Sequence, residues 1–178
     1  SEHTARLVDD LLFIARADAA ELRMHKQAVP IDELARRTCA DARLIGHDKD
    51  ISIDAPRTGH RLIVNGDPDR LQQIVINLIT NSVKFTPPGG QVTLTTTSEP
   101  DRVVLRIADT GPGLGDDELP HLFERFWRGR AGTKAPGSGI GLAVVAELVA
   151  AHHGTLEAAN RAAGGAEFTV TLPHQSSG

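Results

Sequence analysis

Hydrophobic residues along this 178-residue chain recur at spacings that change from one segment to the next. Spacings of three to four residues predict amphipathic helices, whereas alternation and short β-branched runs predict strands. The predicted helices are residues 3–22, 31–44, 67–84, a short one near 117–123, and 140–152. The predicted strands are residues 24–29, 51–54, 62–64, 92–97, 103–108, 156–160 and 166–172. Because strands and helices come in blocks, the pattern favours a layered α+β fold over a doubly wound sheet.

Composition narrows the class of protein. Hydrophobic residues make up 40% of the chain and charged residues 24%, as in an ordinary globular domain. The net charge of -4 gives no general attraction to nucleic acid, so no nucleic-acid partner is expected. The single cysteine, Cys39, excludes an internal disulfide and fits a reducing compartment. The longest apolar run, residues 140–151, contains Glu147 and is too short to span a bilayer. Ser1 stands directly before the predicted helix at residues 3–22, as if within a longer helix, so the chain is expected to be a fragment of a longer protein.

The helix predicted at residues 67–84 carries an unusual polar face. Asp67 and Pro68 form an N-cap and first turn. Asn77, Asn81 and Lys84 stand four and three residues apart, so they share one face. The face is either a plain solvated surface or an ion site, because amide oxygens suit Mg²⁺ and a lysine suits phosphate. The apolar face comprises Leu71, Ile74, Val75, Leu78 and Ile79.

A glycine-rich turn follows the strand predicted at residues 103–108. Residues 109–115 read Asp-Thr-Gly-Pro-Gly-Leu-Gly. Glycines permit close approach of the backbone to a flat ring, and the Asp109 carboxylate would accept a hydrogen bond from the amine of adenine. Guanine would present a carbonyl there instead, which mismatches a carboxylate. The segment therefore predicts a purine pocket, with a turn that binds no ligand as the alternative.

A second glycine loop precedes the last predicted helix. Residues 137–142 read Gly-Ser-Gly-Ile-Gly-Leu, and free N–H groups at a helix N-terminus attract anions. A Rossmann site would need a strand leading into the loop, whereas residues 125–136 are charged and glycine-rich. A P-loop would need Gly-Lys-Ser/Thr, which is absent. Both of these common nucleotide folds are therefore disfavoured.

The segment between the two glycine loops combines apolar residues with clustered cations. Within residues 116–136, Phe123 and Phe126 could anchor a lid, and Arg128 could reach a terminal phosphate. The alternative is a surface loop held by an aromatic contact.

These four motifs, in this order, resemble the catalytic domain of sensor histidine kinases, within the ATPase fold shared with gyrase, Hsp90 and MutL. The resemblance covers about residues 25–173. It implies a two-layer α/β sandwich with an ATP lid, in which about three helices cover one face of a mixed, mostly antiparallel sheet of about five strands. The matching segments are residues 77–86 (N box), 109–113 (first glycine box), 123–128 (F box) and 137–142 (second glycine box).

The resemblance implies a role for each motif around Mg-ATP. Asn81, with Asn77 beside it, would bind Mg²⁺, and Asp109 would recognise adenine. Lys84 and Arg128 would contact the phosphates, so Asn81, Lys84 and Arg128 are the expected catalytic residues. The other residues expected around ATP are Phe85, Gly111, Gly113, Leu114, Phe126, Gly137, Ser138, Gly139, Ile140, Gly141 and Leu142.

Two residues depart from the family pattern. Phe85 and Trp127 stand where the family often has tyrosine, so each keeps apolar bulk and lacks a hydroxyl. ATP binding is expected to survive both changes. Thr169 is a further expectation from the resemblance, as a residue that helps to hold a water near Asp109.

The resemblance also implies a missing partner, because such kinases transfer the γ-phosphoryl of ATP to a histidine on a separate helical hairpin. That histidine normally lies in a His-Glu-x-Arg-Thr-Pro pattern, which this chain lacks, and His3 has no proline after it. Residues 1–22 are therefore expected to be the end of the second hairpin helix, and residues 23–178 the ATP-binding catalytic domain. His152 and His153 are expected to be structural.

The whole kinase would act through its own hairpin on the receiver domain of a response regulator. The parent protein is expected to be a homodimeric bacterial sensor anchored in the membrane, with this part in the cytoplasm. Two alternatives stay open: an ATP-binding signalling module that transfers no phosphoryl group, and a serine kinase or ATPase of the same fold.

Overall fold

A computed structural model describes residues 23–124 and 141–174 of the chain. The predicted helix at residues 3–22 and most of the predicted lid lie outside these ranges. The described helices are α2 (Ile31–Asp48), α3 (Pro68–Phe85), the short 3-10 helix η1 (Leu119–His121) and α5 (Gly141–Ala151). The described strands are β1 (Gln27–Pro30), β2 (Ser52–Asp54), β3 (Ile63–Gly66), β4 (Gln91–Glu99), β5 (Arg102–Asp109), β6 (Thr155–Asn160) and β7 (Ala166–Pro173).

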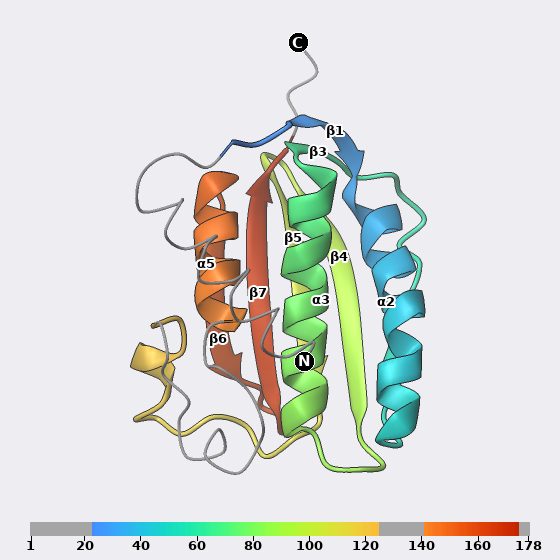
Figure 1. Ribbon diagram of the computed structural model, residues 1–178, viewed down its shortest axis with the longest axis vertical. Coiled ribbons are helices and arrows are strands. Elements are labelled where there is room, and N and C mark those ends of the chain that lie inside the picture. Colours follow the sequence, from blue (N-terminus) through green and yellow to red (C-terminus); the bar gives the residue numbers. More distant parts are fainter. Residues whose placement is uncertain (1–22, 125–140, 175–178) are drawn as a thin grey trace.

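The main sheet has the strand order β2-β4-β5-β7-β6. β2 and β4 are parallel, and the other neighbouring pairs are antiparallel. Figure 1 shows α2, α3 and α5 side by side over one face of this sheet, with α3 in the middle. The described part of the chain is therefore the predicted two-layer α+β sandwich. The predicted mixed sheet of five strands is confirmed.

The core lies between the helical layer and the sheet. Alternate residues of the strands, such as Val92 and Phe168, belong to one buried cluster with the apolar face of α3. Leu78 and Ile79 of α3 have no exposed surface, as their place on the apolar face predicted. Cys39 of α2 is also fully buried, and this burial raises the pKa of its thiol to about 11. No described helix is long and apolar enough to cross a bilayer.

Three local features differ from the sequence prediction. A second, two-stranded sheet pairs β1 with β3, and its partners, from Pro30↔Ile63 to Gln27↔Gly66, are 33 to 39 residues apart, so spacing alone does not reveal the pairing. α2 continues four residues beyond the predicted end, because Gly46 packs tightly on the start of β2. A Cβ on Gly46 would lie 2.5 Å from the carbonyl oxygen of Ile51. The helix predicted near residues 117–123 is reduced to the three residues of η1.

The beginning of α3 is fixed by a buried network of hydrogen bonds. The Asp67 carboxylate accepts from the backbone N–H groups of Asp69 (3.0 Å), Arg70 (3.3 Å) and His25 (3.0 Å). The backbone N–H of Asp67 donates to Nε2 of His152 (3.1 Å), at the end of α5. His152 must therefore be neutral with its proton on Nδ1, which donates to the carbonyl oxygen of Leu148 (2.8 Å). Burial lowers the pKa of His152, in agreement with this arrangement.

The other end of α3 is capped by a lysine. Nζ of Lys49, just after α2, donates to the carbonyl oxygens of Val83 (3.0 Å) and Lys84 (2.7 Å). These carbonyls belong to the last turn, where a helix leaves its acceptors without internal partners and where a positive charge is favourable. α3 is thus fixed at both ends, and the residues of its polar face have defined positions.

Candidate functional site

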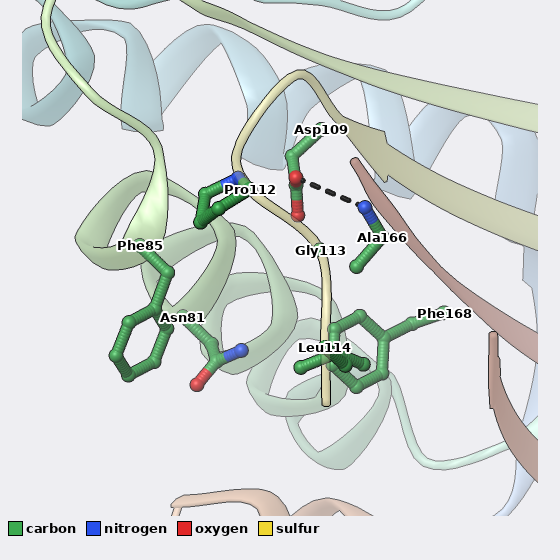
Figure 2. A pocket seen from close by; sticks show the side chains of 8 residues that line it. All are labelled: Asn81, Phe85, Asp109, Pro112, Gly113, Leu114, Ala166 and Phe168. Carbon is green, nitrogen blue, oxygen red and sulfur yellow. Dashed lines mark hydrogen bonds between the residues drawn. The ribbon is translucent and has the colours of Figure 1, made fainter. Parts of the chain in front are cut away.

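A pocket lies where the end of α3, the turn after β5 and the start of β7 meet (Figure 2). α3 contributes an amide and a phenyl ring, the turn contributes a carboxylate and apolar groups, and β7 closes the far side. The residues that line it are Asn81, Phe85, Asp109, Pro112, Gly113, Leu114, Ala166 and Phe168. Segments far apart in the sequence therefore form a single site.

Asp109 is the charged group of this pocket and is 5% exposed. Its Oδ1 accepts hydrogen bonds from the backbone N–H groups of Gly111 (2.9 Å) and Ala166 (3.2 Å). Figure 2 shows the carboxylate beside Ala166, with the apolar side chains of Leu114 and Phe168 farther along the pocket. Oδ2 makes no hydrogen bond within residues 23–124 and 141–174. The two bonds to Oδ1 fix the carboxylate and leave Oδ2 available to accept from a ligand.

Glycines let the turn pack against two other elements. A Cβ on Gly111 would lie 2.9 Å from the carbonyl oxygen of Phe85, so this residue brings the turn against the end of α3. Gly113 has a φ of +84°, and a Cβ there would lie 2.7 Å from Oδ1 of Asn160. The glycines therefore allow close packing of protein backbone, in addition to any approach to a ligand.

The polar face of α3 reaches the pocket near the end of the helix. Asn81 lines the pocket, whereas Asn77, one turn earlier, is buried at 7% exposure and does not line it. Nζ of Lys84 lies 5.9 Å from the centroid of the Phe85 ring, within the range of a cation–π interaction. The face thus presents the side-chain amide of Asn81 at the pocket and the ammonium group of Lys84 one turn farther on.

The described residues include no group of three His, Cys, Asp or Glu side chains that could hold a metal ion. The Asn81 side chain at the pocket carries an amide oxygen, a ligand type that suits Mg²⁺, which takes few protein ligands and completes its shell with water and phosphate oxygens. The donor set fits a metal that arrives with a nucleotide.

Most of the predicted site residues that the structure describes are brought together. Asn81, Phe85, Asp109, Gly113 and Leu114 line the pocket, and Gly111 bonds to the Asp109 carboxylate. The expected residues Phe126, Arg128, Gly137, Ser138, Gly139 and Ile140 lie outside the described ranges, as does Trp127.

Six predicted residues that the structure describes do not line the pocket: Asn77, Lys84, Gly111, Gly141, Leu142 and Thr169. Thr169 lies on β7 opposite Arg106 and Glu157, on the face of the sheet away from Ala166 and Phe168. It is not placed to hold a water at Asp109. Gly141 and Leu142 begin α5.

The sequence prediction missed two lining residues of β7. Ala166 supplies a backbone N–H to Asp109, and Phe168 supplies a ring that packs edge-to-face against Phe123, with 6.4 Å between centroids. Alternation along β7 predicts that both point into the core layer, but it gives no indication that the strand starts beside Asp109.

Comparison with known proteins identifies related sequences and structures. Residues 66–176 match the family model described as histidine kinase-, DNA gyrase B-, and HSP90-like ATPase. The probable sensor histidine kinase TcrY of Mycobacterium tuberculosis is 37% identical over 175 residues, which cover 97% of this chain and 36% of TcrY. The chain spans well under half of the length of the curated relatives that it matches.

Solved structures agree with the sequence matches. A mycobacterial sensor histidine kinase, MprB, is similar with a TM-score of 0.72 at 30% identity, over 84% of this chain and 98% of that one. Full-length ShkA, solved in complex with AMPPNP, is similar with a TM-score of 0.85 at 33% identity, over 99% of this chain and 37% of that one.

Proposed function

We propose that this chain, which belongs to the histidine kinase-, DNA gyrase B-, and HSP90-like ATPase family, is the ATP-binding catalytic domain of a sensor histidine kinase. The observation that carries the proposal is the Asp109 carboxylate, held by two backbone N–H groups in a pocket with one oxygen left for a ligand. The likeness to sensor histidine kinases, one of them solved with AMPPNP, supports it.

The pocket suits the base of ATP. Oδ2 of Asp109 would accept a hydrogen bond from the exocyclic amine of adenine, with apolar contacts from Leu114 and Phe168. Guanine would place a carbonyl oxygen against Oδ2. Two acceptors that face each other in a pocket cost free energy, because both lose hydrogen bonds to water and cannot bond each other. The arrangement thus selects adenine over guanine.

The polar face of α3 suits the phosphates. Asn81 would ligate Mg²⁺, with Asn77 supporting it from one turn earlier, and Lys84 would contact phosphate oxygens. When bound, the ion would neutralise charge on the phosphates. Arg128 and residues 137–140, which lie outside the described ranges, are proposed to complete this side together with Gly141 and Leu142 at the start of α5.

The reaction proposed is transfer of the γ-phosphoryl group to a histidine on a helical hairpin outside this chain. The domain's own contribution is positioning, since phosphoryl transfer depends mainly on alignment and on charge stabilisation. Residues 1–22 would be the end of the second hairpin helix, and the catalytic domain would begin at residue 23.

The parent protein is proposed to be a homodimeric bacterial sensor anchored in a membrane, with this domain in the cytoplasm. A response regulator would receive the phosphoryl group from the hairpin. The free, buried Cys39 agrees with a reducing compartment.

The test supplies the hairpin of a related kinase in trans, with ATP labelled at the γ-phosphate. Acid-labile label on the hairpin is the expected result, and it should disappear when the acceptor histidine is replaced by glutamine. ATP binding without transfer to any cognate hairpin would overturn the kinase proposal in favour of a signalling module. Acid-stable label, or release of phosphate alone, would favour a serine kinase or an ATPase.

A further inference from the structure

A seven-residue segment, 160–166, forms the turn between β6 and β7 and lies against the Asp109 turn. Asn160 is the last residue of β6, and Ala166 is the first of β7. Ala166 supplies one of the two N–H donors to the Asp109 carboxylate. Residues 160–165 do not line the pocket themselves, but they make further contacts with the same turn.

Asn160 pairs with the backbone of a pocket residue. The N–H of Leu114 donates to Oδ1 of Asn160 (2.7 Å), and Nδ2 of Asn160 donates to the carbonyl oxygen of Leu114 (2.7 Å). The side-chain amide thus bonds Leu114 as a neighbouring strand would, with one donor and one acceptor. These are the two hydrogen bonds of the Leu114 backbone within the described ranges.

Arg161 and Gly165 contact the other end of the same turn. One terminal nitrogen of the Arg161 guanidinium donates to the carbonyl oxygen of Asp109 (3.0 Å) and lies 3.4 Å from that of Gly164. Gly165 has a φ of +86°, and a Cβ there would lie 1.9 Å from the Asp109 carbonyl oxygen. Only glycine fits so close an approach, so the segment packs directly on the backbone of Asp109.

We propose that Asn160 and Arg161 are positioning residues for adenine recognition. On the basis of the proposed function, these two residues fix the separation between Leu114, which contacts the base, and Asp109, which accepts from its amine. Both residues lie outside the pocket lining, so they act on base affinity through the turn and leave the phosphate side unchanged.

The test compares two ligands that share phosphates and differ in the base. Dissociation constants for ATP and for inorganic tripolyphosphate, each with Mg²⁺, are measured by calorimetry for the parent chain, Asn160→Ala and Arg161→Ala. The matched controls are Asn65→Ala on β3 and Arg61→Ala before it, both exposed residues far along the sequence from the turn. Because Asn160 is exposed, the variant is expected to fold.

The expected result is a Kd for ATP raised about tenfold in Asn160→Ala and about threefold in Arg161→Ala, with the Kd for tripolyphosphate unchanged. Selectivity for ATP over GTP should fall in parallel. Asn160→Asp keeps the acceptor for Leu114 but sets a carboxylate oxygen against its carbonyl, so it should bind ATP at least as weakly as Asn160→Ala. Hydrogen exchange of the Leu114 amide should quicken in both Asn160 variants.

An ATP Kd within twofold of the parent in both alanine variants would overturn the inference, while the proposed function would stand. Equal losses for ATP and tripolyphosphate would also overturn it, because they indicate a general structural defect. A parent chain that binds no ATP would sink the proposed function itself, and the inference with it.

Discussion

The two ends of α3 use polar side chains in opposite ways. At its beginning, the Asp67 carboxylate and the His152 ring bond to backbone groups of the protein. Beyond its end, Oδ1 of Asp109 accepts two backbone hydrogen bonds, and Oδ2, which is proposed to accept from adenine, has no hydrogen-bond partner within residues 23–124 and 141–174. Both carboxylates are almost fully buried, so burial alone does not separate a structural carboxylate from a binding one. The two carboxylates differ instead in their hydrogen bonds. Both oxygens of Asp67 accept hydrogen bonds, whereas within the described residues only Oδ1 of Asp109 does.

The largest expected effect is at the binding end. Asp109→Asn preserves the shape of the side chain but sets an NH₂ group in place of the acceptor proposed for the adenine amine. We expect the Kd for ATP to rise about 100-fold, equivalent to about 2.7 kcal/mol, with a much smaller change in stability. Calorimetric titration with ATP measures this effect. The exposed Asp101→Asn on the turn between β4 and β5 is the control, and parent-like binding by Asp109→Asn would refute the adenine assignment.

The next effect is at the structural end. Asp67→Ala removes the N-cap and leaves three backbone N–H groups without their acceptor. The free energy of unfolding should fall by about 2 kcal/mol, while the folded fraction binds ATP as the parent does. Urea denaturation with and without ATP checks both statements. Asp69→Ala, in the exposed first turn of α3, should lose only about 0.5 kcal/mol. Equal losses in the two variants would show that the cap is unimportant.

The third prediction concerns pH. Burial lowers the pKa of His152, so below about pH 6.5 the unfolded chain binds more protons than the folded one. The free energy of unfolding should therefore fall as the pH drops through this range, by at most about 1.4 kcal/mol per pH unit from this group. The Asp67 carboxylate favours the protonated ring, whereas Lys26 and His153 oppose it.

Urea denaturation of His152→Gln between about pH 5 and 7.5 should show a flatter dependence than the parent. His153→Asn is the matched control, because His153 is exposed and Asn tolerates its φ of +60°. A parent-like slope in His152→Gln would disprove the assignment to this ring.

The smallest effect lies inside α3 itself. The Ser82 hydroxyl is buried and has no hydrogen-bond partner among the described residues. Ser82→Ala should therefore raise the free energy of unfolding by about 1 kcal/mol without changing the Kd for ATP. Gln72→Ala, at an exposed position of α3, measures the part due to helix propensity. A loss of ATP affinity in Ser82→Ala would instead show that Ser82 contributes to ATP binding.

The sequence predicted features that depend on local spacing. The Asp67–Pro68 pair predicted the start of α3 within one residue, and strand alternation predicted β4, β5 and β7 within two. The family resemblance, which rests on the order of the motifs, predicted that the asparagine helix and the Asp109 turn form one pocket.

Features that depend on distant partners were not predictable in the same way. Asn160 lies 46 residues from Leu114, and a single exposed asparagine at a strand end has no local pattern that indicates a partner. Thr169 was expected at the pocket, but a shift by one residue along β7 places a side chain on the opposite face of the sheet. The Asp67 bond to His152 spans 85 residues and appears only when α5 is packed beside α3.

The buried thiol on α2 has a practical consequence. Cys39 carries the one sulfhydryl group of the chain, and with a pKa of about 11 it is almost entirely protonated at neutral pH. An alkylating reagent in solution can react with the Cys39 thiol only when α2 separates from the core and exposes it. The rate of Cys39 alkylation, measured by mass spectrometry, therefore reports how often the core opens, and it needs no substitution near the proposed nucleotide site.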